Sequence, residues 1–168
     1  LERGTHYVTQ ESWRAEDGKL WRPDVVVHLP RRKVLVIDSK VSLNDYEIAV
    51  NAEGPSDRTA ALRRHVTAIR AHVTTLSDKG YQRIDNASVD YVVMFIPIEG
   101  ALSEALRVDP DLGLSALNQR VVLATPMTLM PMLRTVDHIW AVERRETNAM
   151  EIAQRAGHLY DKLALFVD

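Results

Sequence analysis

The sequence predicts an α/β fold with a mixed central sheet, helices on both faces and a long C-terminal helical segment. Three observations lead to this prediction. Two short β-branched runs, Val25–Leu29 and Val34–Ile37, flank a turn and predict a β-hairpin. Apolar residues then recur at spacings of three and four, which is typical of a helix, before a nearly continuous apolar run at Val89–Ile96. Such a run is typical of a strand that is buried on both faces.

The first part of the chain leads into the hairpin. Leu1–Gln10 has the pattern of a helix end that enters a strand, and Pro30 to Lys33 supplies the turn between the two hairpin strands. Strands joined by so short a turn pair antiparallel. The hairpin therefore brings the residues before its first strand next to those after its second.

A helix is expected at Leu43–Glu53, ending at Gly54-Pro55, and the next helix should be capped by Ser56 or Asp57. That second helix carries one apolar stripe over about five turns. The stripe consists of Leu62, Val66, Ile69, Val73 and Leu76.

Two histidines, His65 and His72, lie at the edge of this stripe with several arginines nearby. They could contact a phosphate backbone, but half-buried structural histidines are the more frequent case at such positions. Zinc-binding pairs on a helix are usually four residues apart with a third ligand, and this pair is seven apart.

The strand at Val89–Ile96 should run parallel to Val34–Ile37, because a helix connects the two and such crossovers are right-handed. If the strands are neighbours, Glu99 emerges close to the end of the hairpin. Glu99 then either assists chemistry there or caps a helix that begins near Ala101, and the sequence favours neither alternative.

The remaining elements are two short helices, Ala101–Arg107 and Asp111–Asn118, and a last strand at Val121–Ala124. Thr125-Pro126 then provides an N-cap and a first-turn proline for a long helical segment. We expect one domain, in which residues 1–125 form the α/β core and residues 126–168 form a helical segment packed on it.

Charged residues gather at the open end of the hairpin. Asp24 precedes the first strand, and Asp38, Ser39 and Lys40 follow the second. If an odd number of residues connects the strands, Asp24 pairs with Asp38 and the two Cβ atoms lie about 5 Å apart. Two such carboxylates suit Mg²⁺, or Mn²⁺, with Lys40 placed to orient a water or to offset phosphate charge. Alternatively, Asp24 only starts a strand, Asp38-Ser39 caps the following segment and Lys40 is solvated.

Composition restricts the classes of function. The chain has no Cys, which excludes disulfides and thiolate metal sites and suits a reducing compartment. It has no apolar run of about 18 residues, so we expect no membrane contact by this segment. A net charge of −2 argues against a strongly basic nucleic-acid binder. Any contact with DNA would therefore use local patches and a bound cation.

Several blocks of sequence resemble a known family. Pro23-Asp24 with Asp38-Ser39-Lys40 resembles the signature of PD-(D/E)xK nucleases. More narrowly, the chain is similar to the RmuC family of DNA recombination proteins over nearly its whole length. The blocks that carry this resemblance are RPDVVVHLP, VIDSKVSL, MFIPIE, VVLATPMTLM and EIAQRAGHLYDK.

The resemblance implies a PD-(D/E)xK nuclease-like fold and metal-dependent hydrolysis of DNA in recombination or repair. Asp24, Asp38 and the Ser39 carbonyl would hold Mg²⁺ or Mn²⁺, Lys40 would be catalytic and Glu99 would assist. The alternative is a non-catalytic module that retains the fold and either binds DNA or assembles through a coiled coil.

The resemblance also implies a larger context. The chain begins at Leu1 without an initiating Met, and we expect a longer, cytoplasmic protein with an upstream inner-membrane anchor and a coiled coil that makes a homo-oligomer. An upstream helix would supply a further acidic residue, so the fragment alone is expected to have little or no nuclease activity.

Overall fold

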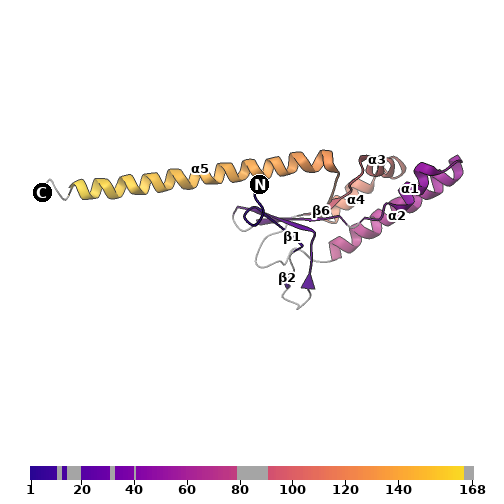
Figure 1. Ribbon diagram of the computed structural model, residues 1–168, viewed down its shortest axis with the longest axis horizontal. Coiled ribbons are helices and arrows are strands. Elements are labelled where there is room, and N and C mark those ends of the chain that lie inside the picture. The colour runs from indigo at the N-terminus through magenta and orange to yellow at the C-terminus, as the bar shows by residue number, and fades with distance from the viewer. Residues whose placement is uncertain (11–12, 15–19, 31–32, 40, 79–90, 165–168) are drawn as a thin grey trace.

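The computed structural model has a five-stranded mixed sheet between layers of helices (Figure 1). It describes residues 1–10, 13–14, 20–30, 33–39, 41–78 and 91–164. The strand order is β1-β4-β5-β6-β7, and a separate two-stranded sheet pairs β2 with β3. The strands are β1 (Tyr7–Thr9), β2 (Trp13–Arg14), β3 (Leu20–Trp21), β4 (Val25–Leu29), β5 (Lys33–Asp38), β6 (Val92–Phe95) and β7 (Val121–Ala124). The helices are α1 (Asn44–Asn51), α2 (Pro55–Asp78), α3 (Glu99–Val108), α4 (Leu112–Asn118) and α5 (Pro126–Ala164).

Strands β4 and β5 form the predicted antiparallel hairpin. Val25 pairs with Ile37 at one end and Leu29 with Lys33 at the other, so three residues connect the strands. The connection is therefore odd, which is the condition for a pairing of Asp24 with Asp38. Extending this register by one residue outward sets Asp24 opposite Asp38.

The other half of the sheet is parallel. β5 pairs with β6, and β6 pairs with β7, each in parallel orientation. α2 connects β5 to β6 and covers one face of the sheet, which confirms the expected strand, helix and parallel strand. Because parallel strands end at the same edge, the residues that follow β5 and β6 lie at one edge of the sheet.

Alternation along β5 divides its side chains between two cores. Val34 and Val36 face α2, where the main core also contains Ile69, Val73 and Met94. Helices α3 and α4 contribute small buried residues to this same core, among them Ala101 and Ala116.

The opposite face of the sheet packs against the first half of α5. Val27 and Ile37 are buried there, while Val25 and Leu35 are half-buried. Val136 is the buried residue that α5 contributes to this core. Beyond Glu143, the described side chains of α5 are all exposed through residue 158, and Figure 1 shows the helix extending past the sheet.

Two expectations about helix starts need correction. The first residues form turns and a β-bridge between Arg3 and Tyr7 instead of a helix end, although the strand that should follow is present as β1. α2 begins at Pro55, not after a cap at Ser56 or Asp57. Proline suits a first helical turn, because its fixed φ is helical and it has no N–H to leave unpaired.

The predicted N-cap of the last helix agrees with the structure. α5 begins at Pro126, and the Thr125 backbone N–H donates a hydrogen bond to Thr128 Oγ1 at 2.8 Å. Of the expected strand Val89–Ile96, residues 89 and 90 lie outside the described part, and β6 covers Val92–Phe95. No helix in the described ranges combines the length and the hydropathy that a bilayer span requires.

Candidate functional site

Asp38 is the last residue of β5 and has no exposed surface. Alternation from Val34 and Val36 turns its side chain to the face that α2 covers. There its Oδ1 lies 3.6 Å from Nε2 of His72, a half-buried residue on α2. Since a buried carboxylate is costly unless it has partners, the position calls for a cation or hydrogen-bond donors around Asp38.

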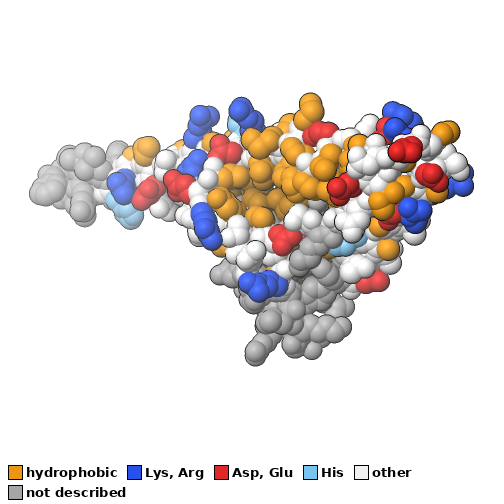
Figure 2. All heavy atoms as spheres, turned by 45° about the vertical axis from the view of Figure 1, so that its right-hand side comes forward, with side chains coloured by type: hydrophobic (Ala, Val, Ile, Leu, Met, Phe, Trp, Pro, Cys, Tyr) orange, Lys and Arg blue, Asp and Glu red, His pale blue; other side chains and the backbone are white. Residues whose placement is uncertain are grey.

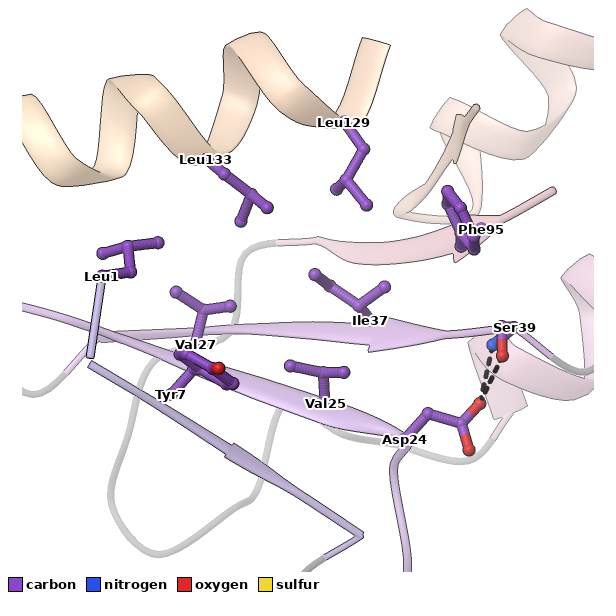
Figure 3. Close-up of a pocket in the computed structure, with 10 residues that line it drawn as sticks. All are labelled: Leu1, Tyr7, Asp24, Val25, Val27, Ile37, Ser39, Phe95, Leu129 and Leu133. Atoms are coloured by element: carbon purple, nitrogen blue, oxygen red, sulfur yellow. Dashed lines mark hydrogen bonds between the residues drawn. The ribbon is translucent and has the colours of Figure 1, made fainter. Parts of the chain in front are cut away.

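Asp24 is held at the end of the neighbouring strand by bonds on both sides. Its carbonyl accepts a hydrogen bond from the Gln10 N–H at 3.0 Å, which extends the pairing of β1 with β4. Its Oδ2 accepts hydrogen bonds from the Ser39 N–H at 2.8 Å and the Ser39 hydroxyl at 2.9 Å, as Figure 3 shows. The carboxylate thus ties the open end of the hairpin together.

Of the expected site residues, Lys40 lies outside the described residues. The described residues contain no group of three or more His, Asp or Glu side chains placed to hold a metal ion. Asp24 and Asp38 therefore lie at the ends of two neighbouring strands, and the Asp24 carboxylate is already hydrogen-bonded to Ser39.

Glu99 has a role that neither sequence alternative included. It begins α3, and its Oε1 accepts a hydrogen bond from the backbone N–H of Met127 at 2.8 Å. Met127 is in the first turn of α5, where unpaired N–H groups and the helix dipole favour a carboxylate. Glu99 thus caps α5, and the N-cap position of its own helix is occupied by Ile98.

The two histidines of α2 differ in their surroundings. His65 has no exposed surface, and its Nε2 lies 3.2 Å from the Ala101 carbonyl oxygen, to which the Nε2–H tautomer donates. Burial lowers the pKa of His65, opposed by the bond to Ala101 and by the charge of Asp45. The structural role expected for His65 is thus supported by its contacts.

His72 is the residue near the site that sequence reasoning did not connect to it. Spacing along α2 sets His72 at the edge of the apolar stripe, but only the packing of α2 on β5 reveals its contact with Asp38. The sequence offered one indication of this contact. The expected crossover places α2 over the sheet face at the end of β5, where Asp38 lies.

An apolar pocket of about 420 Å³ opens beside Asp24, on the α5 side of the sheet. In Figure 3, Leu129 and Leu133 of α5 point toward Val25, Val27 and Ile37 of the hairpin. Figure 2 shows hydrophobic side chains gathered in the middle of one face of the molecule, with charged side chains around them. Because Asp38 faces α2, this pocket lies on the other face from the buried carboxylate.

Several arginines that could contact a phosphate backbone form ion pairs within the domain. Arg64 Nε lies 2.7 Å from Asp45 Oδ1, and Arg70 Nε lies 2.6 Å from Asp109 Oδ2. The hydrogen bond from Arg70 lowers the pKa of Asp109. These pairs link α2 to its neighbouring helices, so they reduce the positive charge that this surface could offer to DNA.

The fold and the site together define an α/β domain whose sheet carries an acidic strand-end site. A family model described as the RmuC family matches residues 1–168, and the chain therefore belongs to the RmuC family. The expectation of membership from the sequence blocks is confirmed.

Curated relatives of the chain also belong to the RmuC family by name. The chain is 47% identical to the "DNA recombination protein RmuC homolog" of Vibrio cholerae, covering 100% of this chain and 33% of that protein. It is 45% identical to the RmuC homolog of Pseudomonas aeruginosa, covering 99% of this chain and 37% of that one. It is 41% identical to "DNA recombination protein RmuC" of Escherichia coli K12, over 100% and 36% of the two chains.

The chain thus spans about a third of the length of these relatives. No solved structure gives a significant match. The comparisons establish the family and its connection with DNA recombination by name, and they assign no chemistry to individual residues.

Proposed function

We propose that this chain is the nuclease-like domain of a DNA recombination protein and hydrolyses phosphodiester bonds with a divalent metal ion. One observation carries the proposal. Val25 pairs with Ile37 in the register of β4 and β5, and extending that register by one residue would bring Asp24 opposite Asp38, which supports the motif. The names of the relatives supply the connection with DNA recombination.

Asp24 and Asp38 would suit a magnesium site with few protein ligands. Mg²⁺ is usually held in proteins by one or two carboxylates, with waters and substrate phosphates as its other ligands. Asp24 and Asp38 would be these carboxylates, joined by the Ser39 carbonyl. Mg²⁺, or Mn²⁺, would supply charge stabilisation for the phosphate and a more acidic bound water.

The chain's own residues would prepare the site. Asp38 is fixed by its place in the sheet, so its carboxylate would be oriented without a large loss of side-chain entropy. Asp38 has no exposed surface, and an ion would reach it only after neighbouring side chains move. Lys40, two residues further, would orient the attacking water or neutralise phosphate charge.

A non-catalytic module is the second candidate, and a specific observation favours it. Asp24 Oδ2 accepts both hydrogen bonds from Ser39, which is what a purely structural strand-end residue would do. In that case the domain would bind DNA, or assemble with other copies through a coiled coil, without cleaving.

A cleavage assay separates the two candidates. Wild-type protein and Asp38→Asn would be incubated with labelled linear, branched and single-stranded DNA in Mg²⁺ and in Mn²⁺. The nuclease proposal expects wild-type cleavage to fall by at least about 100-fold in Asp38→Asn, because the variant loses a charged ligand.

Asp137→Asn is the matched control, because it makes the same chemical change at an exposed position of α5. It should cleave like wild type. Equal activity of Asp38→Asn and Asp137→Asn, or no cleavage by any form on every substrate, would favour the non-catalytic module.

A further inference from the structure

The contact between Asp38 and His72 points to a ligand of the site that the motif does not contain. Nε2 of His72 is buried, and among the described residues it has no hydrogen-bond partner. Asp38 Oδ1 lies 3.6 Å from this nitrogen, which is too long for a hydrogen bond. A buried polar nitrogen in such a position requires an explanation.

We propose that His72 is a metal ligand beside Asp38, so that the site prefers a first-row transition ion such as Mn²⁺ to Mg²⁺. The inference rests on the proposed function, because it takes Asp38 as a ligand of the same ion. It adds a residue from α2 to a site that the motif builds only from the hairpin.

The distance supports a shared ion. Ligand atoms that are each about 2.1 Å from one ion, at angles between 90° and 120°, are separated by about 3.0–3.6 Å. The separation of 3.6 Å between Nε2 and Oδ1 is at the upper end of this range. A neutral imidazole that turns its lone pair toward a carboxylate is repelled, and a cation between the two atoms removes the repulsion.

Ligand chemistry then determines the preferred ion. Imidazole nitrogen suits first-row transition ions, whereas Mg²⁺ takes mainly carboxylate, carbonyl and water oxygens. Because the His72 imidazole would join the Asp38 carboxylate as a ligand, binding should be tighter for Mn²⁺ than for Mg²⁺, and removal of the imidazole should reduce that preference.

The competing explanation is an ion pair, in which a protonated His72 neutralises the buried Asp38 and no metal is involved. The two explanations differ in what His72 does when Mn²⁺ is added. A ligand bonds directly to the ion, whereas an ion-pair partner leaves its nitrogen protonated and uncoordinated.

Pulsed electron paramagnetic resonance of Mn²⁺ added to the full chain tests this directly. A directly bound imidazole gives a nitrogen coupling in the Mn²⁺ spectrum, so the wild-type spectrum alone is informative even if a variant fails to fold. We expect the coupling in wild type and in His138→Asn, an exposed control on α5, and its loss in His72→Asn.

Calorimetric titration completes the test. In His72→Asn, Mn²⁺ affinity should fall by at least about 10-fold, while Mg²⁺ affinity should change by less than about 3-fold. If Mn²⁺ binding depends on Asp38 but shows no nitrogen coupling, the inference about His72 is wrong and the proposed nuclease site stands. If Asp38→Asn binds Mn²⁺ like wild type, or wild type binds none, both fail.

Discussion

Burial of His65 makes the folding stability of this domain depend on pH. Its pKa is lowered from 6.5 in the folded protein, chiefly by burial. The unfolded chain therefore binds a proton more readily, and it gains an advantage as the pH falls below about 6.5. The contribution of a neutral His65 is complete above that pH and is lost progressively below it.

His65→Gln should remove this part of the pH dependence, because an amide can still donate to the Ala101 carbonyl but does not titrate. We expect the free energy of unfolding of wild type to fall between about pH 7.5 and about pH 5.5 by more than that of the variant. Urea unfolding at the two pH values measures the difference. His158→Gln, the same substitution at an exposed position, is the matched control.

Asp24 should stabilise the hairpin whether or not it binds a metal. Asp24→Ala removes the acceptor of two hydrogen bonds from Ser39, and we expect it to cost about 1–2 kcal/mol in urea unfolding with chelator present. Asp24→Asn keeps one carbonyl oxygen and should cost less. An alanine variant as stable as wild type would contradict a structural role for this clamp.

For single residues, the sequence predicts strand pairing better than it predicts side-chain contacts. Alternation tied the pairing of Asp24 with Asp38 to an odd connection, and the structure meets that condition because Lys33 belongs to β5 and not to the turn. The bond from Asp24 to Ser39 and the contact of His72 with Asp38 depend on rotamers and on how α2 docks, which no local rule specifies. Glu99 likewise caps a helix that begins 27 residues later in the chain, at Pro126.

Among the elements, α2 is the helix on which the main core depends. Ile69 has no exposed surface and lies in the largest core cluster. Ile69→Ala should cost about 2–5 kcal/mol, because the removed methyl groups leave a cavity. Ile48→Ala on α1, where the side chain is 52% exposed, is the matched control and should cost less than about 1 kcal/mol. Similar losses for the two variants, measured by urea unfolding, would contradict the assigned core.

The two halves of α5 should differ in their effect on stability. The first half packs on the sheet, and Trp140 Nε1 donates to the His28 carbonyl at 2.9 Å. The described side chains from Arg144 to His158 are exposed. Removing residues 144–168 should therefore change the free energy of unfolding by less than about 1 kcal/mol.

Thermal melts at several protein concentrations measure this effect. A large and concentration-dependent loss of stability in the shortened form would mean that the second half of α5 contacts another copy. Trp140→Phe should destabilise in either case, since it leaves the His28 carbonyl without its donor.

Element identity was predictable where the pattern was long. Helix α2 was predicted from its apolar stripe, which repeats over several turns. The start of α5 was predicted from two signals together, an N-cap residue and a first-turn proline. The two-residue strands β2 and β3 were not predicted, since pairs so short have no periodicity to detect. The turns at Gly4 and the bridge from Arg3 replaced an expected helix end.

For the whole molecule, activity should depend on chain length. The described residues supply two strand-end carboxylates, and the chain spans about a third of its relatives' length. We expect residues 1–168 alone to bind Mg²⁺ weakly and to cleave DNA poorly, and a form extended upstream to be more active. Parallel cleavage assays of the two forms, each with Asp38→Asn, measure the difference. Equal activity of residues 1–168 and the longer form would contradict this expectation.

We propose that Asp24 and Asp38 hold a catalytic metal ion at the end of the β4–β5 hairpin. Anomalous diffraction from crystals of the protein soaked in Mn²⁺ with bound DNA would locate this ion. We expect a peak about 2.0–2.6 Å from carboxylate oxygens of both residues, next to a phosphate. An absent peak there, with Asp24 still bonded to Ser39 while DNA is bound elsewhere on the domain, would contradict the claim.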